Sequence, residues 1–199
     1  MTSGLILASA SSVRVRLLEA AGLEVRVEPA AIDESAIKQA FRAEGGAAHS
    51  CALALAEAKA GAVAGRRDRS LVIGADQILV CCGAWFDKPS DLGEARAQLE
   101  ALRGRTHELA TAVCAVRGGT MLWHTVSRPQ LTMREFSDEF LDAYIAAEAA
   151  ALLGSVGAYR LEGRGAQLFE RIEGDYFAVL GLPLLDLLAF LRDGGEIPS

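Results

Sequence analysis

The sequence predicts an α/β fold in which helices flank a mixed β-sheet. Three observations lead to this prediction. Strand-like and helix-like segments alternate through the first half of the 199 residues, a hairpin-like stretch follows, and hydrophobic residues make up 51% of the chain. Such a composition is ample for a core, and the length fits one domain or one domain with two lobes.

The first half reads as strands and helices in alternation. Leu5–Ala8 is an apolar run typical of an interior strand, and Ser11 or Ser12 caps a helix that ends at Gly22. The most apolar run, residues 70–82, predicts a central strand interrupted at residues 74–76. The other segments are a strand at 23–29, a short helix at 34–44, a long alanine-rich helix at 47–65 and an amphipathic helix at 91–104.

The second half adds the antiparallel component of the sheet. Two strands within residues 107–133 are joined through Gly118 and Gly119 as a hairpin. The remaining segments predict a capped helix at 137–150, a strand at 157–163, a short helix at 166–174, a strand at 176–181 and a final helix from Pro183. A hairpin among βα units favours a mixed sheet.

Charge and cysteine usage exclude several classes of protein. A net charge of −6 argues against a nucleic-acid or membrane-surface binder, no segment has the unbroken apolarity of a membrane span, and residues 1–4 lack the basic region of a secretory signal. The four cysteines lack a zinc spacing, and Cys81 and Cys82 are expected on opposite faces of a strand. We therefore expect reduced thiols and a cytoplasmic protein.

The small-residue loop Ser9–Ser11 predicts an anion site. A strand, a small-residue loop and a helix start leave unpaired backbone N–H groups at the positive end of the helix dipole. Arg14 and Arg16 add cationic donors just inside the helix. Neither a P-loop nor a Rossmann fingerprint occurs, so the expected anion site is of another type.

Charged residues on apolar elements predict the rest of the site. Asp76 follows the buried-looking run LVIGA, where a carboxylate needs a partner, a metal or a catalytic role, although a turn-capping aspartate is the plain alternative. Lys59 lies on an alanine-rich helix and Lys88 in a proline-fixed loop; each alone is typical of a solvated side chain. Asp33 and Glu34 offer carboxylates to a hard metal ion. His107 is interpreted as a strand cap rather than a ligand-binding residue.

Together these residues fit metal-dependent hydrolysis of a nucleotide phosphoanhydride. The loop with Arg14, Lys59 and Lys88 would hold a polyphosphate, and Asp33, Glu34 and Asp76 would hold a divalent metal ion and orient water. Phosphoryl transfer needs mainly such positioning and charge neutralisation, with a carboxylate base.

In order along the chain, several motifs resemble those of the Maf-like nucleotide pyrophosphatases. They are LILASASSVRVRLLEAAGL, IDE, LALAEAKA, LVIGADQI, DKP, LRGRTHELATAV and GAYRLEGRGAQLFERIEGDYFAVLGLPL, and they span residues 5–188. The resemblance implies one domain, residues 1–199, similar in fold to inosine triphosphate pyrophosphatase. That fold is an elongated mixed sheet with a cleft between two lobes. It also implies cleavage to a nucleoside monophosphate and pyrophosphate, a divalent cation (Mg²⁺ or Mn²⁺), and a homodimer.

The resemblance also implies roles for individual residues. Asp76 matches the proton acceptor, Glu34 matches a carboxylate associated with metal or water, and both are expected to bind the metal ion. Ser9, Arg14, Lys59 and Lys88 match phosphate-binding positions. The first motif departs from the family pattern, in which a proline follows the second serine, because Ser12 and Val13 stand there.

The resemblance further implies that three positions are associated with the choice of base, and Val13, Gln77 and Glu162 stand there in this chain. Gln77 and Glu162 resemble the subgroup that prefers 7-methyl-GTP, and a carboxylate suits the two adjacent N–H donors of guanine. Val13 replaces a tryptophan that would stack on the cationic base, so weaker discrimination is expected. The alternatives are a thymidine- and uridine-triphosphate pyrophosphatase and a nucleotide-binding regulator of septum formation with little catalysis.

Overall fold

The chain forms two compact units in a computed structural model that describes residues 4–67 and 69–198. Unit 1 comprises Met1–Gln77, Thr111–Ser127 and Gly181–Ser199, and unit 2 comprises Ile78–Ala110 and Arg128–Leu180. Parts of the predicted domain 1–199 at residues 1–3, 68 and 199 lie outside the described residues.

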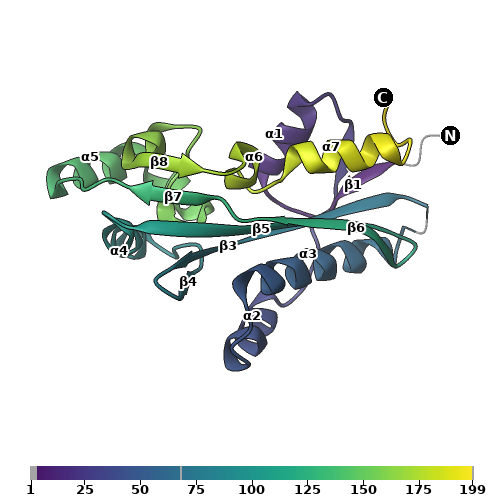
Figure 1. Cartoon of the computed structure of the whole chain (residues 1–199), viewed down its shortest axis with the longest axis horizontal. Coiled ribbons are helices and arrows are strands. Elements are labelled where there is room, and N and C mark those ends of the chain that lie inside the picture. Colours follow the sequence, from purple (N-terminus) through teal and green to yellow (C-terminus); the bar gives the residue numbers. More distant parts are fainter. Residues whose placement is uncertain (1–3, 68, 199) are drawn as a thin grey trace. The chain divides into compact units, whose positions relative to one another are not determined.

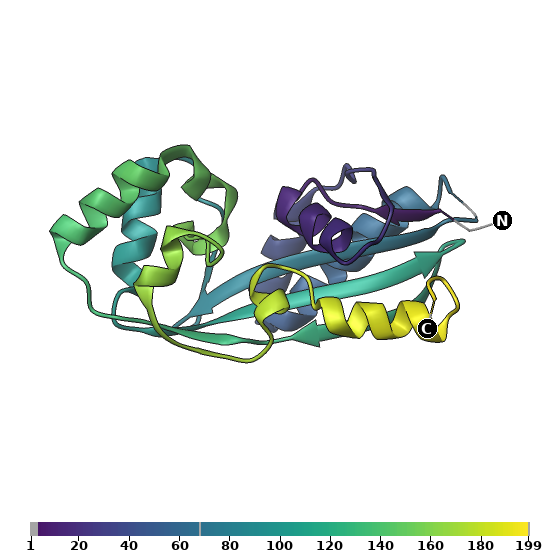
Figure 2. The same cartoon turned by 90° about the horizontal axis from the view of Figure 1, so that it is seen from above.

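Unit 1 is a layer of strands with helices on both faces. β1 (Leu5–Leu7) lies between β2 (Val25–Val27) and β3 (Leu71–Cys81) and is parallel to both. β5 (Thr106–Arg117) pairs antiparallel with β6 (Thr120–Ser127). Residues 78–81 of β3 and 106–110 of β5 belong to unit 2. Figures 1 and 2 show helices on both faces of these strands. The helices on one face are α1 (Ser12–Ala20) and α7 (Leu184–Asp193), and those on the other are α2 (Glu34–Ala43) and α3 (Ala48–Ala64).

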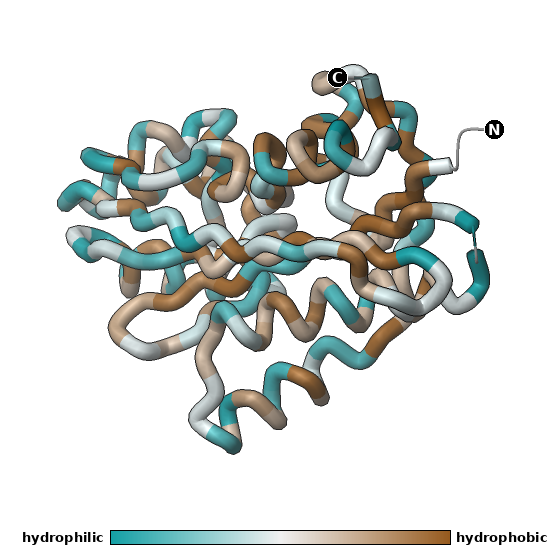
Figure 3. The backbone as a smooth tube through the Cα atoms, turned by 45° about the vertical axis from the view of Figure 1, so that its right-hand side comes forward, coloured by the Kyte–Doolittle hydropathy of each residue, from teal (hydrophilic) through white to brown (hydrophobic). Residues whose placement is uncertain are grey.

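Sequence patterning explains the position of these helices. α2 is strongly amphipathic, and Figure 3 shows hydrophilic and hydrophobic residues alternating along it. Asp33 caps α2, since its Oδ1 accepts a hydrogen bond from the Ala36 N–H at 2.9 Å. α3 is alanine-rich and buries nine residues, so its small side chains allow a close approach to the sheet.

Unit 2 is built around a separate apolar cluster. Its strands are β4 (Ala84–Phe86), β7 (Gln130–Met133) and β8 (Phe169–Glu173), and its helices are α4 (Leu92–Leu102), α5 (Asp138–Glu148) and the short α6 (Tyr176–Val179). Three 3₁₀ turns follow α5: η1 (Ala149–Gly154), η2 (Val156–Ala158) and η3 (Arg164–Leu168). Leu79, Leu99, Leu131, Leu141 and Leu168 belong to the buried cluster.

Hydrogen-bonded neighbours in the sheet follow the order β2-β1-β3-β5-β7-β8, and β4 pairs with β3 and β6 with β5. The sheet contains parallel and antiparallel pairs, so the predicted α/β fold with a mixed sheet and flanking helices is confirmed. Among the described residues, no helix combines the length and the apolarity that crossing a membrane requires.

Five sequence-based expectations about elements are wrong. The stretch 107–133 contributes to three strands, β5, β6 and β7, rather than two. β3 runs without interruption through residues 74–76. Residues 157–163 form no strand, because Gly157 and Ala158 have φ values of +76° and +56°. Residues 166–174 form η3 and then β8. Residues 176–179 are helical rather than extended, because the Asp175 carboxylate caps α6 by accepting hydrogen bonds from Phe177 N–H and Ala178 N–H at 3.0 and 3.1 Å.

Two expectations about single residues are also corrected. His107 lies inside β5 rather than at its cap, and its Nε2 is 2.8 Å from the Tyr159 hydroxyl. Cys81 ends β3, while Cys82 turns into the left-handed region at φ +50°, so their sulfur atoms lie 3.9 Å apart rather than on opposite faces. All four cysteines are free thiols.

Candidate functional site

The small-residue loop after β1 is held in a defined conformation. Ser9 Oγ accepts a hydrogen bond from Ser11 N–H at 3.2 Å, and Ser11 caps α1 by accepting one from Arg14 N–H at 3.4 Å. Ser9 is buried. The loop and the first turn of α1 therefore present backbone N–H groups at a helix start, as the sequence predicts for an anion site.

Arg14 connects this loop to two distant segments. Its Nε donates to the Gly181 carbonyl oxygen at 2.7 Å, and its Nη1 donates to Ser9 Oγ at 3.1 Å and to the Ala75 carbonyl oxygen at 2.8 Å. Burial lowers the pKa of Arg14 from its ordinary value, and the negative charges of Asp76 and Glu34 oppose this shift. An arginine keeps its charge in proteins. A buried positive charge therefore contacts Ala75, the neighbour of Asp76 in the chain.

Asp76, Lys59 and Glu34 form a charged cluster. Lys59 Nζ lies 2.5 Å from Asp76 Oδ1 and 2.8 Å from Glu34 Oε1. Asp76 and Lys59 are buried, whereas 44% of the Glu34 side chain is exposed. The structure thus brings together a carboxylate in the middle of β3, a lysine from α3 and the first residue of α2. The sequence around Lys59 allows either a site residue or a solvated side chain. The structure shows a buried Lys59 side chain.

A close approach of α3 to β3 places Lys59 beside Asp76. A Cβ atom at Gly74 would lie 2.0 Å from the Ala56 carbonyl oxygen and 2.9 Å from Ala60 Cβ. Real Cβ atoms do not approach other heavy atoms so closely, so only glycine fits at position 74. Gly74 is two residues from Asp76, and Ala56 and Ala60 flank Lys59 in α3. Sequence reasoning missed Gly74, although a glycine inside a strand pattern signals a close backbone approach.

Gln77, next to Asp76, is oriented by a buried hydroxyl. Its Nε2 donates to Thr111 Oγ1 at 2.8 Å, and Thr111 is fully buried in β5. Val13 lies half-buried in the first turn of α1. Ser9, Val13, Arg14, Glu34, Lys59, Asp76 and Gln77 all belong to unit 1.

Two predicted site residues belong to unit 2. Lys88 lies in the exposed loop between β4 and α4, and Glu162 lies in the turn after η2, where its Oε1 is 3.4 Å from Arg160 Nε. Their roles stay predictions.

The donor set of the cluster fits a divalent metal ion. The oxygens of Glu34 and Asp76 converge on the Lys59 ammonium, so the cluster already favours a positive charge at that point. Mg²⁺ binds through one or two carboxylates together with water and phosphate oxygens. Over residues 4–67 and 69–198, no group of three or more His, Cys, Asp or Glu side chains could hold a metal ion. Phosphate oxygens and water would have to complete the coordination. Asp33 has its Oδ1 engaged as the cap of α2.

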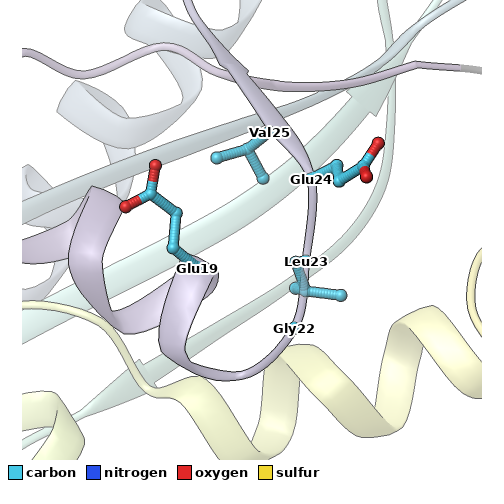
Figure 4. A pocket seen from close by; sticks show the side chains of 5 residues that line it. All are labelled: Glu19, Gly22, Leu23, Glu24 and Val25. Atoms are coloured by element: carbon cyan, nitrogen blue, oxygen red, sulfur yellow. The ribbon is translucent and has the colours of Figure 1, made fainter.

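A separate pocket lies at the end of α1 and the start of β2 (Figure 4). Its lining residues are Glu19, Gly22, Leu23, Glu24 and Val25. Two carboxylates without a cationic side chain do not suit a phosphate, so this pocket is not part of the candidate site.

Comparisons with known proteins show similarity along nearly the whole chain. Residues 4–194 match the sequence model of the family described as Maf-like protein. A nucleoside triphosphate pyrophosphatase of Granulibacter bethesdensis is 58% identical over 94% of this chain and 95% of its own. One from Paramagnetospirillum magneticum is 52% identical over 96% and 99%. A 7-methyl-GTP pyrophosphatase of Rhizobium johnstonii is 48% identical over 99% of both chains.

Proposed function

Because the chain belongs to the Maf-like protein family, we propose that it hydrolyses a nucleoside triphosphate to the monophosphate and pyrophosphate. One observation above all supports this activity. The buried Asp76 carboxylate lies 2.5 Å from the Lys59 ammonium. Arg14, in the first turn of the helix that follows the small-residue loop, donates to the carbonyl oxygen of the neighbouring Ala75. A base beside a cationic anion site is what hydrolysis of a phosphoanhydride needs.

In the proposed reaction Asp76 accepts a proton from the attacking water. The water oxygen forms a bond to phosphorus, the P–O bond between the α and β phosphates breaks, and pyrophosphate leaves with the bonding electrons. The hydrogen bond from Lys59 Nζ orients the Asp76 carboxylate. Ser9, Arg14, Lys59 and Lys88 bind the phosphates. The positive charges of Arg14, Lys59 and Lys88, together with the N–H groups of α1, stabilise the charge on the transferring oxygens.

We assign the metal ion to Glu34 and Asp76, with Mg²⁺ or Mn²⁺ as the cation. When bound, it would neutralise phosphate charge and polarise the reacting phosphoryl group. Glu34 is exposed enough to reach a metal ion that enters with the nucleotide. Lys59 has three N–H donors, so it would contact the phosphates while it keeps its hydrogen bond to Asp76.

We assign the base preference to Val13, Gln77 and Glu162. Glu162 only accepts hydrogen bonds and so matches the adjacent N1–H and amino donors of guanine, whereas uracil and thymine present one donor flanked by carbonyls. The orientation of Gln77 by Thr111 supports a defined contact with the base. Relatives carry both the general name and the name 7-methyl-GTP pyrophosphatase. We therefore propose a guanine-type substrate such as 7-methyl-GTP.

A panel of 7-methyl-GTP, GTP, UTP and thymidine triphosphate tests the base assignment through kcat/KM. The highest value is expected for a guanine nucleotide. A higher kcat/KM for UTP or thymidine triphosphate, together with no effect of Glu162→Gln, would overturn the assignment without touching the proposed reaction.

Two further proposals concern the setting of the enzyme. Three of the four free thiols are buried, which supports a reducing compartment and hence the cytoplasm. We also propose a homodimer that binds neither nucleic acid nor membranes. Light scattering coupled to size-exclusion chromatography should give twice the 21.0 kDa chain mass.

Asp76→Asn is the decisive test of the reaction. The variant should keep its fold and its affinity for nucleotide while kcat falls by about 10²-fold or more, because the amide cannot accept the proton. Pyrophosphate release measures kcat, and Asp193→Asn, at an exposed position of the same unit, serves as the matched control. Hydrolysis by Asp76→Asn at the wild-type rate would remove Asp76 from the mechanism.

A further inference from the structure

Gln98 is a buried polar residue on the apolar face of α4. Only 7% of it is exposed, and it lies one turn from Ala95 and from Leu102, both fully buried. A buried amide must satisfy both its donor and its acceptor, or destabilise the fold. Gln98 satisfies both across two separate segments of unit 2. Its Nε2 donates to the Asp87 carbonyl oxygen at 2.9 Å, and its Oε1 accepts from Gly157 N–H at 3.1 Å.

The first segment is the loop that carries Lys88. Gln98 holds its beginning at Asp87, and Glu94 holds its end, since Glu94 Oε2 accepts hydrogen bonds from Ser90 N–H and Ser90 Oγ, both at 2.8 Å. Asp91 caps α4 through Glu94 N–H at 2.8 Å. The backbone on both sides of Lys88 is therefore fastened to one helix, and Gln98 is the contact on the Asp87 side.

The second segment leads to Glu162. Gly157 has φ +76°, and a Cβ there would lie 2.6 Å from Leu79 Cδ1 and 2.8 Å from the Tyr159 ring. The backbone at Gly157 is therefore packed against the core of unit 2, and its N–H is committed to Gln98. The chain then continues through the buried Tyr159 to the turn that carries Glu162.

We propose that Gln98 is a positioning residue that fixes Lys88 and Glu162 relative to each other. The inference rests on the proposed function, in which Lys88 binds phosphate and Glu162 binds the base. One amide then sets the spacing between a phosphate contact and a base contact of the same nucleotide. These two contacts need a hydrogen-bond donor and an acceptor on one side chain of this length. Glutamine provides both, whereas methionine provides no donor and glutamate, when ionised, only acceptors.

Gln98→Met tests the proposal with little change in side-chain volume. KM for 7-methyl-GTP, or for UTP if the panel shows it to be hydrolysed faster, should rise about tenfold, as expected for lost buried hydrogen bonds, while kcat changes less than about threefold. Hydrogen exchange at the Gly157 amide should accelerate. Glu100→Gln, on the exposed side of the same helix, should change neither quantity.

Double variants separate positioning from a general structural effect. If Gln98 acts through the two contacts, Gln98→Met should raise KM much less when Lys88→Ala and Glu162→Gln are already present. Gln98→Glu keeps the acceptor for Gly157 but repels the Asp87 carbonyl, so its effect should shrink with Lys88→Ala and persist with Glu162→Gln. It also provides a second variant should Gln98→Met fail to fold.

Three outcomes would overturn the proposal. One is a wild-type KM in a folded Gln98→Met or Gln98→Glu variant. Another is a fold-change in KM of each double variant that equals the product of the fold-changes of its two single variants, as for independent residues. The third is an unchanged KM in both Lys88→Ala and Glu162→Gln, which removes the contacts that Gln98 is said to position. Asp76→Asn and the pyrophosphate assay are independent of all three, so they show separately whether the proposed hydrolysis stands.

Discussion

Gly74→Ala should damage both stability and catalysis through one displacement. The new Cβ would lie 2.0 Å from the Ala56 carbonyl oxygen, so α3 must retreat from β3 by at least about 1 Å to reach the shortest contacts that folded proteins tolerate. Overpacking of this severity costs about 3 kcal/mol, which lowers the Tm of a chain of this size by about 6–12 °C. Because α3 carries Lys59, which contacts Asp76 at 2.5 Å, a shift of about 1 Å should reduce kcat by about 10²-fold.

Gly61→Ala is the matched control for this substitution. Gly61 lies in α3, and a Cβ there would meet nothing within 4 Å. Alanine is favoured over glycine in a helix by about 1 kcal/mol, so Gly61→Ala should melt at or above the wild-type temperature and retain full activity. Circular dichroism melting and pyrophosphate release measure the two quantities. A Gly74→Ala protein with wild-type Tm and kcat would refute the idea that this close contact positions Lys59.

Three further outcomes are expected. Burial lowers the pKa of His107 from 6.5 to about 4, so as the pH falls the unfolded chain binds a proton at this residue before the folded chain does. The free energy of unfolding is therefore unaffected by His107 above about pH 6.5, and it falls by up to about 3 kcal/mol as the pH drops to 4. Urea unfolding at pH 7 and pH 4.5 should show that the free energy of unfolding falls less with acid in His107→Gln than in the wild type. An equal fall in both proteins would contradict a buried neutral imidazole. A chelator should abolish hydrolysis without lowering the Tm, and added Mg²⁺ or Mn²⁺ should restore it; persistent activity would exclude the assigned metal ion. In the native protein, the exposed Cys82 should react first with a thiol reagent, because burial raises the pKa of Cys81 to about 11 and that of Cys114 to about 12, and all four thiols should react after denaturation. Fewer than four thiols in protein kept from oxidants would argue against a reducing compartment.

The sequence predicts the charged residues of the site better than their partners. Asp76 and Lys59 stand out because each interrupts an apolar element, and the structure brings them into contact. That Arg14 joins Ser9, Ala75 and Gly181 could not be predicted, because the contact depends on a tertiary arrangement that no local pattern encodes. Gln98 did leave a signal, since it is a polar residue on the apolar face of a predicted amphipathic helix.

The errors in the predicted elements have local causes. The segment at 157–163 has the composition of a strand, but its left-handed residues, Gly157 and Ala158, turn the backbone away from an extended path. Residues 176–179 are apolar enough for a strand, yet the preceding Asp175 starts a helix instead. Apolar runs this short do not distinguish a strand from a buried helical turn, so flanking caps decide between them.

The hydrogen bond from Arg14 to Gly181 spans 167 residues of sequence and so has a consequence for synthesis. A ribosome adding about 5–20 residues per second needs roughly 8–33 s to progress from Arg14 to Gly181. During that interval the segment Ile78–Leu180 is completed, while unit 1 still lacks its last segment, Gly181–Ser199. The Arg14 guanidinium therefore has one carbonyl partner missing in the nascent chain. The loop that is proposed to bind phosphate therefore reaches its final form only after Gly181 has been synthesised.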